Sequence, residues 1–183
     1  YTDNVTDDNS CSGSDNITIT QPDQYDITVG QTDLDCFGEC DATATVTVNS
    51  GGTPNYTILW DDPLNQNTFT ATNLCAGTYI ATVSDANSCD SLITFTIDDP
   101  DELTLSVNVS SAACFGSCSG EATLTPNGGT GLITYEWFEA ITNVPLGVNN
   151  TTIAGLCPGD DYATATDING CTTTTPIFSI VEL

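Results

Sequence analysis

Hydrophobic and polar residues alternate along most of this chain, with the two-residue period of strands that are buried on one face. The pattern is clearest in the segment DATATVTVN, where Thr alternates with Ala and Val. It continues in YTILW, TFTAT, TYIATV and SLITFTI, and stretches rich in Gly, Pro, Asn and Asp separate these segments. No segment has the 3.6-residue period of an amphipathic helix. The chain is therefore predicted to be all-β.

The same five-residue phrase is written twice, as CFGEC from Cys36 and as CFGSC from Cys114, 78 residues later. The end of each copy also recurs, because NLCAGTYIATVSDANSC, which ends at Cys89, matches GLCPGDDYATATDINGC, which ends at Cys171, 82 residues later. The difference is a net insertion near FEAITNVPLGVNN, and insertions of this kind belong in surface loops. The chain is therefore built from a repeated β-rich unit.

A partial third copy opens the chain. YTDNVTDDNSC, which ends at Cys11, aligns without gaps with YIATVSDANSC, and Pro22 aligns with Pro100. We therefore predict the C-terminal part of one repeat at 1–22, a complete repeat at 23–100 and a second at 101–183. About six or seven strands per repeat favour an immunoglobulin-like antiparallel β-sandwich, and the tandem copies predict an elongated head-to-tail array. Trp60 and Trp137 fall on the third strand of each repeat, where core packing is expected rather than sugar stacking.

The charge balance excludes several classes of partner. The chain has 25 Asp and Glu residues and no Lys, Arg or His, which gives a formal charge of −25. Nucleic-acid phosphates are held by Lys and Arg, so nucleic-acid binding is not expected. No apolar run approaches the ~20 residues of a membrane span, so membrane insertion of this segment is not expected either. A hydrophobic content of 39% and a mean hydropathy of −0.03 are nevertheless those of a folded protein.

Catalytic chemistry is equally restricted. Without His, the chain cannot form a Ser-His-Asp or Cys-His arrangement, and without Lys it cannot form a Schiff base. Only carboxylate chemistry remains, and no pair of acids lies in a recognisable motif. We therefore expect a protein that is not an enzyme.

The motifs together resemble the SprB repeat. They are the Cys-Phe-Gly phrase, the Gly-Gly-Thr-Pro-x-Tyr turn, Trp60, the Cys-Ala-Gly-Thr-Tyr corner and the Asp-x-Asn-x-Cys turn. The last repeat departs from this pattern, with GGTGLI in place of GGTPNY and Asp161 at the position of Tyr79. The resemblance implies tandem repeats of a very long surface protein of gliding bacteria, similar to cargo of type IX secretion. It brings no catalytic residue with it.

Nine cysteines in 183 residues indicate an oxidising compartment and predict disulfide bonds. The strand Tyr79–Val83 separates Cys75 from Cys89 by more than the ~7 Å that a disulfide allows between Cα atoms. If the first and last strands run parallel, Cys75 lies at the same end of the sandwich as Cys36 and Cys40. We therefore favour Cys40–Cys75 and, by the internal repeat, Cys118–Cys157.

Cys36 then needs a partner outside this end of its own sandwich. In a head-to-tail array the end that carries Cys36 meets the end of the next repeat that carries Cys171, which predicts an interdomain Cys36–Cys171 disulfide. Cys11, Cys89 and Cys114 would then pair with cysteines outside this segment. The alternative is an intradomain Cys36–Cys89 bond, with Cys114–Cys171 as its equivalent. A zinc site of four cysteines is disfavoured, because structural zinc usually takes closely paired thiolates.

Two further sites are suggested by short motifs. The segment DDPDE and the turn SDANSCD carry oxygen ligands of the kind that bind Ca²⁺, and the alternative is that they are solvated turns. The residues concerned are Asp98, Asp99, Asp101, Glu102, Asp85 and Asn87. The triplet Asp-Ser-Leu resembles the acceptor of bacterial O-glycosylation and makes Ser91 a candidate for a glycan.

The sequence therefore predicts a structural repeat of an extracellular, cell-surface filament or adhesin, linked to surface attachment or gliding. Its expected partners are neighbouring repeats of the same chain, bundled filaments, and an external surface or polysaccharide. The alternative is a lectin-like module that binds glycans or surfaces through its loops. The insertion from Glu139 to Asn150 is the segment distinctive enough for that second function.

Overall fold

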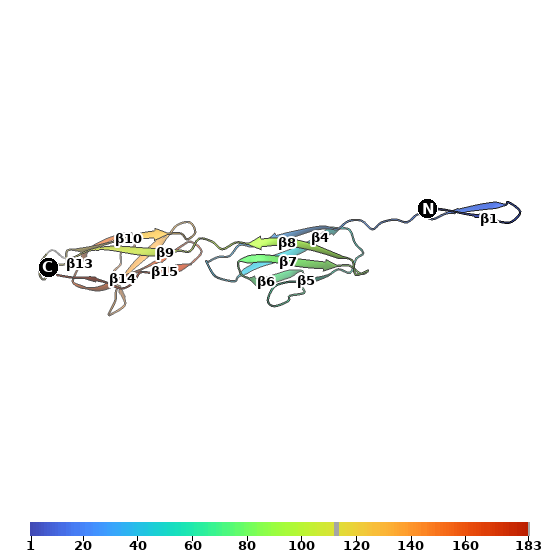
Figure 1. Cartoon of the computed structure of the whole chain (residues 1–183). Helices are drawn as coiled ribbons and strands as arrows, with labels where there is room; N and C mark the ends of the chain where they lie inside the picture. The colour runs from blue at the N-terminus through green and yellow to red at the C-terminus, as the bar shows by residue number, and fades with distance from the viewer. Residues whose placement is uncertain (112–113, 183) are drawn as a thin grey trace.

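The computed structural model describes residues 1–111 and 114–182, and all regular elements within them are β-strands. The strands form an N-terminal hairpin, a first sandwich and a second sandwich. Figure 1 shows the two sandwiches in line, with the hairpin carried beyond an extended segment at the N-terminal side. In the described part of the chain, no helix has the length and hydrophobicity needed to cross a lipid bilayer.

The first sandwich packs two three-stranded sheets. One sheet has the order β3-β4-β6 and the other the order β5-β7-β8, and all neighbours are antiparallel. This is the A-B-E and C-F-G arrangement of immunoglobulin-like folds, so the predicted fold is confirmed. The strands are β3 (Asp26–Gln31), β4 (Ala42–Ser50), β5 (Thr57–Trp60), β6 (Thr70–Leu74), β7 (Gly77–Ser84) and β8 (Asp90–Ile97).

The second sandwich repeats this arrangement with one addition. Its sheets have the orders β13-β10-β9 and β12-β11-β14-β15, and β16 also pairs with β14. The short strand β12 lies in the insertion and extends the second sheet by pairing with β11. The strands are β9 (Thr104–Ser110), β10 (Gly120–Asn127), β11 (Thr134–Glu139), β12 (Val144–Pro145), β13 (Thr152–Leu156), β14 (Gly159–Thr166), β15 (Thr172–Thr174) and β16 (Phe178–Ile180).

Each core is built around one Trp, as the alternating pattern predicts. Trp60 and Trp137 are fully buried, and each packs edge-on against a Phe of the last strand, at ring-centroid distances of 5.8 Å for Trp60–Phe95 and 6.2 Å for Trp137–Phe178. Each indole N–H donates to a backbone carbonyl, because a buried polar group needs a partner. Sugar stacking on these two rings is excluded, since neither reaches the surface.

The two ends of each sandwich are chemically distinct. The first and last strands run side by side in the same direction, with the Gln31 side chain donating to the Thr96 carbonyl at 2.7 Å. The turn Cys36–Cys40 and the β6–β7 corner with Cys75 therefore lie at one end, which we call the Cys-Phe-Gly end. The turn Asp85–Cys89 lies at the opposite end, which we call the Asp-x-Asn end.

The N-terminal hairpin is a fragment of the same architecture. β1 (Thr2–Thr6) pairs with β2 (Ser12–Asn16), and every residue from 1 to 24 is exposed. The hairpin corresponds to β7 and β8 of the first sandwich by the sequence alignment. It carries its own Asp-x-Asn-x-Cys turn without the rest of a sandwich around it.

Candidate functional site at the junction of the two sandwiches

The Asp-x-Asn-x-Cys turn of the second sandwich is organised by one buried carboxylate. Asp167 accepts backbone N–H groups from Thr130 at 2.8 Å and from Asn169 and Cys171 at 3.0 Å each. The Thr130 N–H contributes most to lowering the pKa of the Asp167 carboxyl, burial opposes it, and the Cys171 and Asn169 N–H groups lower it further. The carboxylate thus fixes the position at which the turn presents Cys171.

The same turn recurs in the first sandwich. Asp85 accepts N–H groups from Thr53, Asn87 and Cys89 at 2.8, 2.9 and 2.9 Å. The pKa of Asp85 is lowered, mainly by the Cys89 and Thr53 N–H groups and against the effect of burial. The repeated bonding shows that this Asp is a structural part of the turn.

The N-terminal hairpin contains the third copy of the turn. Asp7 accepts the N–H groups of Asn9 and Cys11, at 3.0 and 2.8 Å. The residue before the cysteine has a positive φ in every copy, 65° at Ser10, 62° at Ser88 and 89° at Gly170. The turn therefore forms in the same way with or without a surrounding sandwich.

The Cys-Phe-Gly turn is anchored to its own sandwich by a disulfide. Ala42 pairs with Leu74 at the start of β4, which places Cys40 beside Cys75. These two cysteines form a disulfide with a Cα–Cα distance of 3.9 Å, and Cys118 and Cys157 form the equivalent bond at 3.8 Å. Gly38, with a φ of 74°, closes the tight turn in which the Glu39 N–H donates to the Cys36 carbonyl.

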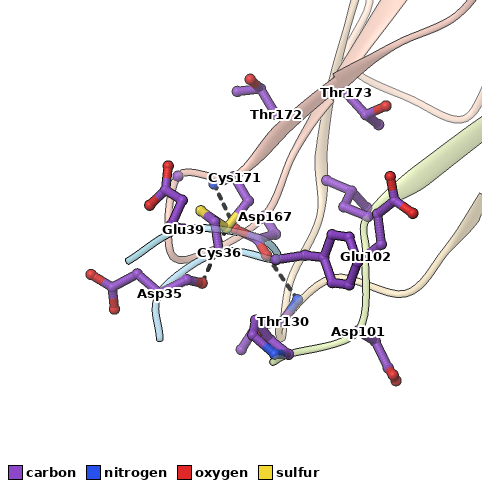
Figure 2. A pocket seen from close by; sticks show the side chains of 14 residues that line it. Asp35, Cys36, Glu39, Asp101, Glu102, Thr130, Asp167, Cys171, Thr172 and Thr173 are labelled. Carbon is purple, nitrogen blue, oxygen red and sulfur yellow. Dashed lines mark hydrogen bonds between the residues drawn. A yellow bond between two sulfur atoms is a disulfide. The ribbon is translucent and has the colours of Figure 1, made fainter. Parts of the chain in front are cut away.

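Cys36 reaches across to the second sandwich. It forms a disulfide with Cys171, 135 residues away, at a Cα–Cα distance of 5.5 Å. Beside this bond the Asn169 amide donates to the Asp35 carbonyl at 3.1 Å, and the Gly38 N–H donates to the Asp99 carboxylate at 2.9 Å. Figure 2 shows Cys36 and Asp35 of the first sandwich lying against Cys171 and Asp167 of the second. A disulfide and one hydrogen bond therefore join the two sandwiches, and a second hydrogen bond joins the Cys-Phe-Gly turn to the segment 98–103 between them.

A cleft of about 310 Å³ lies at this junction and has walls from both sandwiches. The first sandwich contributes Phe37 and Glu39, and the second contributes Leu103 and Thr173. Several carboxylates also line the cleft, and Asp35, Asp101 and Glu102 are labelled in Figure 2. No cation faces them, since the chain has no Lys, Arg or His.

The proposed calcium ligands are divided between two places. Asp101 and Glu102 line the junction cleft, and Asp98 and Asp99 line a second hollow beside it. Asp85 and Asn87 lie at the opposite end of the first sandwich, where both oxygens of Asp85 accept backbone N–H groups. Within residues 1–111 and 114–182, no three His, Cys, Asp or Glu side chains are grouped as a metal site requires. Calcium binding stays a prediction for the residues beside the junction.

The remaining candidate residues lie away from the junction. Cys11, Cys89 and Cys114 are free and exposed, so the alternative pairs Cys36–Cys89 and Cys114–Cys171 are absent from this structure. Ser91 lies on β8 and lines a hollow together with Cys89, and its glycosylation stays a prediction. The insertion forms β12 and borders another hollow, of about 340 Å³, beside Tyr135 and Val148.

Several residues of the junction were not identified from the sequence. They are Asp35, which accepts from Asn169, Phe37 in the cleft, and Asp167, which shapes the turn. The signal for Asp167 was available, because the Asp-x-Asn-x-Cys pattern occurs three times with the cysteine in the same place. The contacts of Asp35 and Phe37 depend on how the two sandwiches meet, for which the strand pattern contains no signal.

Comparisons with known proteins agree with the sequence motifs. Residues 28–65 and 106–138 match the family model of the SprB repeat, which confirms the resemblance found in the sequence. No curated protein sequence matches the chain.

Solved structures with similarity over most of the chain have low sequence identity. The mouse nectin-like molecule 4 ectodomain (Ig1–Ig3) has a TM-score of 0.38 and 13% identity, over 88% of this chain and 64% of its own. The amphioxus IgVJ-C2 molecule has a TM-score of 0.36 and 13% identity, over 88% of this chain and 98% of its own. The C-terminal 282-residue fragment of intimin, solved with the translocated intimin receptor domain, has a TM-score of 0.36 and 13% identity, over 89% and 64%. The present chain thus spans less than two thirds of the first of these proteins, and the fold assignment rests on the strand order.

Proposed function

We propose that this protein is a non-catalytic structural segment of a long extracellular filament or adhesin on a cell surface. Its β-sandwich repeats would follow one another head to tail, and the SprB family match supports a role in surface attachment or gliding. Three disulfides support an oxidising, extracellular location. The expected route to that location is type IX secretion, as the family resemblance implies.

The Cys36–Cys171 bond between the two sandwiches is the observation that carries this proposal. Most domains in a tandem chain move relative to each other unless their interface is large and hydrophobic. This interface is acidic, yet a disulfide and the Asn169–Asp35 hydrogen bond cross it. Tension along the filament would then pass through the disulfide as well as through the linker 98–103. The arrangement suits a module whose task is to keep its length and direction under force.

The charge of the chain supports a filament that stays separate from its surroundings. A formal charge of −25 with no compensating cation makes copies of the chain repel each other and disfavours non-specific association. This repulsion is screened beyond ~8 Å at physiological ionic strength, so it acts only at close contact. Bundling of filaments would need divalent cations or neutral contact surfaces. Ca²⁺ bound by the carboxylates at the junction would act differently, by stiffening the joint between the two sandwiches.

Surface labelling of intact cells tests the proposed function. Antibodies against residues 23–183 should label extracellular filaments along their whole length by immunogold electron microscopy. Labelling confined to the cell interior would contradict the proposal. Labelling at filament tips alone would favour an adhesive module instead.

A second candidate function is glycan or surface binding by the second sandwich. The hollow of about 340 Å³ beside the insertion favours it, because Tyr135 and Val148 provide apolar surface next to polar groups of Glu136 and Asn149. External polysaccharide would be the ligand class. A glycan array probed with the protein tests this function, and matched binding by a variant without residues 140–147 would rule out the insertion as the binding site.

A further inference from the structure

The turn Asp85–Cys89 of the first sandwich repeats the turn Asp167–Cys171, whose cysteine is bonded to Cys36 at the junction, but Cys89 itself has no disulfide partner. The Asp-x-Asn end of this sandwich presents Cys89 from the same hydrogen-bonded turn that presents Cys171, and Cys89 is exposed and free. The Tyr25 hydroxyl donates to the Cys89 carbonyl at 2.8 Å, which ties the turn to the residue just before the first strand of its sandwich. The turn is therefore already in place to receive a partner.

A cleft lies beside Cys89 as one lies beside Cys171. It measures about 420 Å³, against about 310 Å³ for the cleft at the junction. Its lining corresponds by alignment to that of the junction cleft. Pro22, Asp23, Gln24, Tyr25, Asp85 and Cys89 stand where the second sandwich has Pro100, Asp101, Glu102, Leu103, Asp167 and Cys171.

The second sandwich likewise repeats the other side of the junction, the Cys-Phe-Gly turn. Cys114 is exposed and free at its Cys-Phe-Gly end, where Cys36 is bonded in the first sandwich. The next residue, Phe115, is 88% exposed, whereas its equivalent Phe37 is 51% exposed and lines the junction cleft. The apolar ring of Phe115 is therefore free to pack into a cleft, as the ring of Phe37 does at the junction.

We propose that the Cys89 face of one copy of this chain binds the Cys114–Phe115 face of another copy, closed by a Cys89–Cys114 disulfide. The occupied Cys36–Cys171 junction is the internal precedent, because the same residue types already meet there in the same chain. The inference rests on the proposed function, since it treats a second copy of this chain as the neighbouring repeat of the filament. It also assigns the partner of each face: a further copy of the repeat.

Closure of the joint is an oxidation whose atoms and electrons balance. Two thiols lose two protons and two electrons and form one S–S bond. The electrons and protons pass to a low-molecular-weight disulfide such as oxidised glutathione, which becomes two thiols. A docked Phe115 would hold the two sulfurs near each other and raise their effective concentration.

The experiment uses the full chain in a glutathione redox buffer, followed by a non-reducing gel and peptide mapping after cleavage at acidic residues. We expect a ladder of oligomers in which Cys114 is linked to Cys89. Cys11 is the internal control, because it is a free, exposed cysteine on the same turn but in a hairpin whose residues are all exposed, without a sandwich around it. Pairing of Cys114 with Cys11 as often as with Cys89 would overturn the proposal. So would a glutathione-capped monomer, and either result would leave the Cys36–Cys171 junction and the proposed function intact.

A pair of variants separates docking from simple thiol reactivity. F115A should lower the yield of the Cys89–Cys114 bond by about tenfold, the effect expected when a phenyl ring loses its burial in a cleft. L132A removes a side chain that is 73% exposed in the turn between β10 and β11, at the opposite end of the second sandwich from Cys114, and should leave the yield unchanged. Equal yields in F115A and the unaltered chain would show that the ring does not dock, and would overturn the proposed contact.

Discussion

The two sandwiches have equivalent cores but differ in the insertion and at one corner, where the first has Tyr79 and the second Asp161. In the first, Tyr79 stacks on Phe95 at 5.7 Å and its hydroxyl donates to the Cys75 carbonyl at 3.0 Å. In the second, Asp161 takes the place of this Tyr, and it is buried in register with Phe178 and Glu139. Burial raises the pKa of Asp161, and the nearby Glu139 and Asp160 charges raise it further.

This difference shows which parts of the repeat are essential. The Trp–Phe edge contact, the disulfide beside the Cys-Phe-Gly turn and the Asp-x-Asn-x-Cys turn are present in both sandwiches. The aromatic corner is not, so a sandwich of this type can form with a carboxyl group in its place. We expect the second sandwich to be the less stable one at neutral pH, because it buries a charge beside other negative charges.

Loss of the core ring contact is the largest expected effect. F178A should lower the free energy of unfolding of the second sandwich by about 3–5 kcal/mol, as expected for a buried Phe replaced by Ala. Denaturant unfolding followed by Trp137 fluorescence in a W60F background measures it. F115A is the matched control, because its ring is 88% exposed, and it should change stability by no more than ~0.5 kcal/mol. Equal effects of the two variants would contradict the assigned core.

Removal of the intradomain disulfides is expected to affect the two sandwiches alike. The bonds Cys40–Cys75 and Cys118–Cys157 span 35 and 39 residues, so the loss of loop-closure entropy is nearly the same. The double variants C40S/C75S and C118S/C157S should each lower stability by ~2–4 kcal/mol in their own sandwich. A much larger loss of stability in one sandwich would show that its corner, with Tyr79 in the first sandwich or Asp161 in the second, changes how much the disulfide contributes.

The buried Asp161 makes the stability of the second sandwich depend on pH. The pKa of Asp161 is raised in the folded state. Its favourable contribution to the free energy of unfolding is therefore fully present below the unfolded-state pKa, and it is lost as pH rises through the folded-state pKa. D161N should therefore stabilise the second sandwich at pH 7, by less than ~1 kcal/mol after solvent screening, and leave it unchanged at low pH. Thermal unfolding at both pH values measures this, with Trp60 of the first sandwich as the internal reference. Stabilisation of equal size at both pH values would contradict the assigned charge effect.

The two Asp-x-Asn turns differ in whether a partner is bound, and this gives the smallest predicted effect. D167N places an amide group where two carboxylate oxygens accept N–H groups, so it should speed the reduction of Cys36–Cys171 by a few-fold. D85N makes the same change in the unoccupied turn and should leave that rate unaltered. The rate follows from timed thiol alkylation and mass spectrometry. If Cys36–Cys171 were reduced at the same rate in D167N and D85N, the Asp167 turn would not contribute to the stability of the junction disulfide.

Acid should also weaken both turns. The lowered pKa values of Asp85 and Asp167 mean that their contribution is present above the unfolded-state pKa and is lost as pH falls through the folded-state pKa. This is the reverse of the Asp161 effect. Thermal unfolding of D161N over a series of pH values therefore measures the effect of Asp85 and Asp167, because this variant lacks the opposing titration of Asp161.

Much of the fold followed from local sequence features. The alternation in DATATVTVN correctly places Ala42, Ala44 and Val46 in the core, and the position of Trp60 on the third strand matches its burial. Local turn residues also separate the strands as predicted. The contacts that make the junction could not be obtained in this way. Phe37 and Asp35 meet the second sandwich only because the linker sets one relative orientation, and no strand pattern encodes that orientation.

The candidate calcium and glycan sites show the limit of short motifs. Asp85 and Asn87 have the spacing of oxygen ligands, yet their groups form a hydrogen-bonded turn. A two-residue spacing of polar groups fits both uses, and only the surrounding N–H groups distinguish them. Calcium binding and glycosylation at these motifs therefore stay predictions.

The central claim is that a disulfide locks one sandwich to the next. Non-reducing peptide mapping of the protein isolated from its native, oxidising environment tests it most directly. We predict a linked peptide that joins Cys36 to Cys171, alongside the two intradomain pairs. A peptide that joins Cys36 to Cys89, or free thiols at both Cys36 and Cys171, would contradict the account.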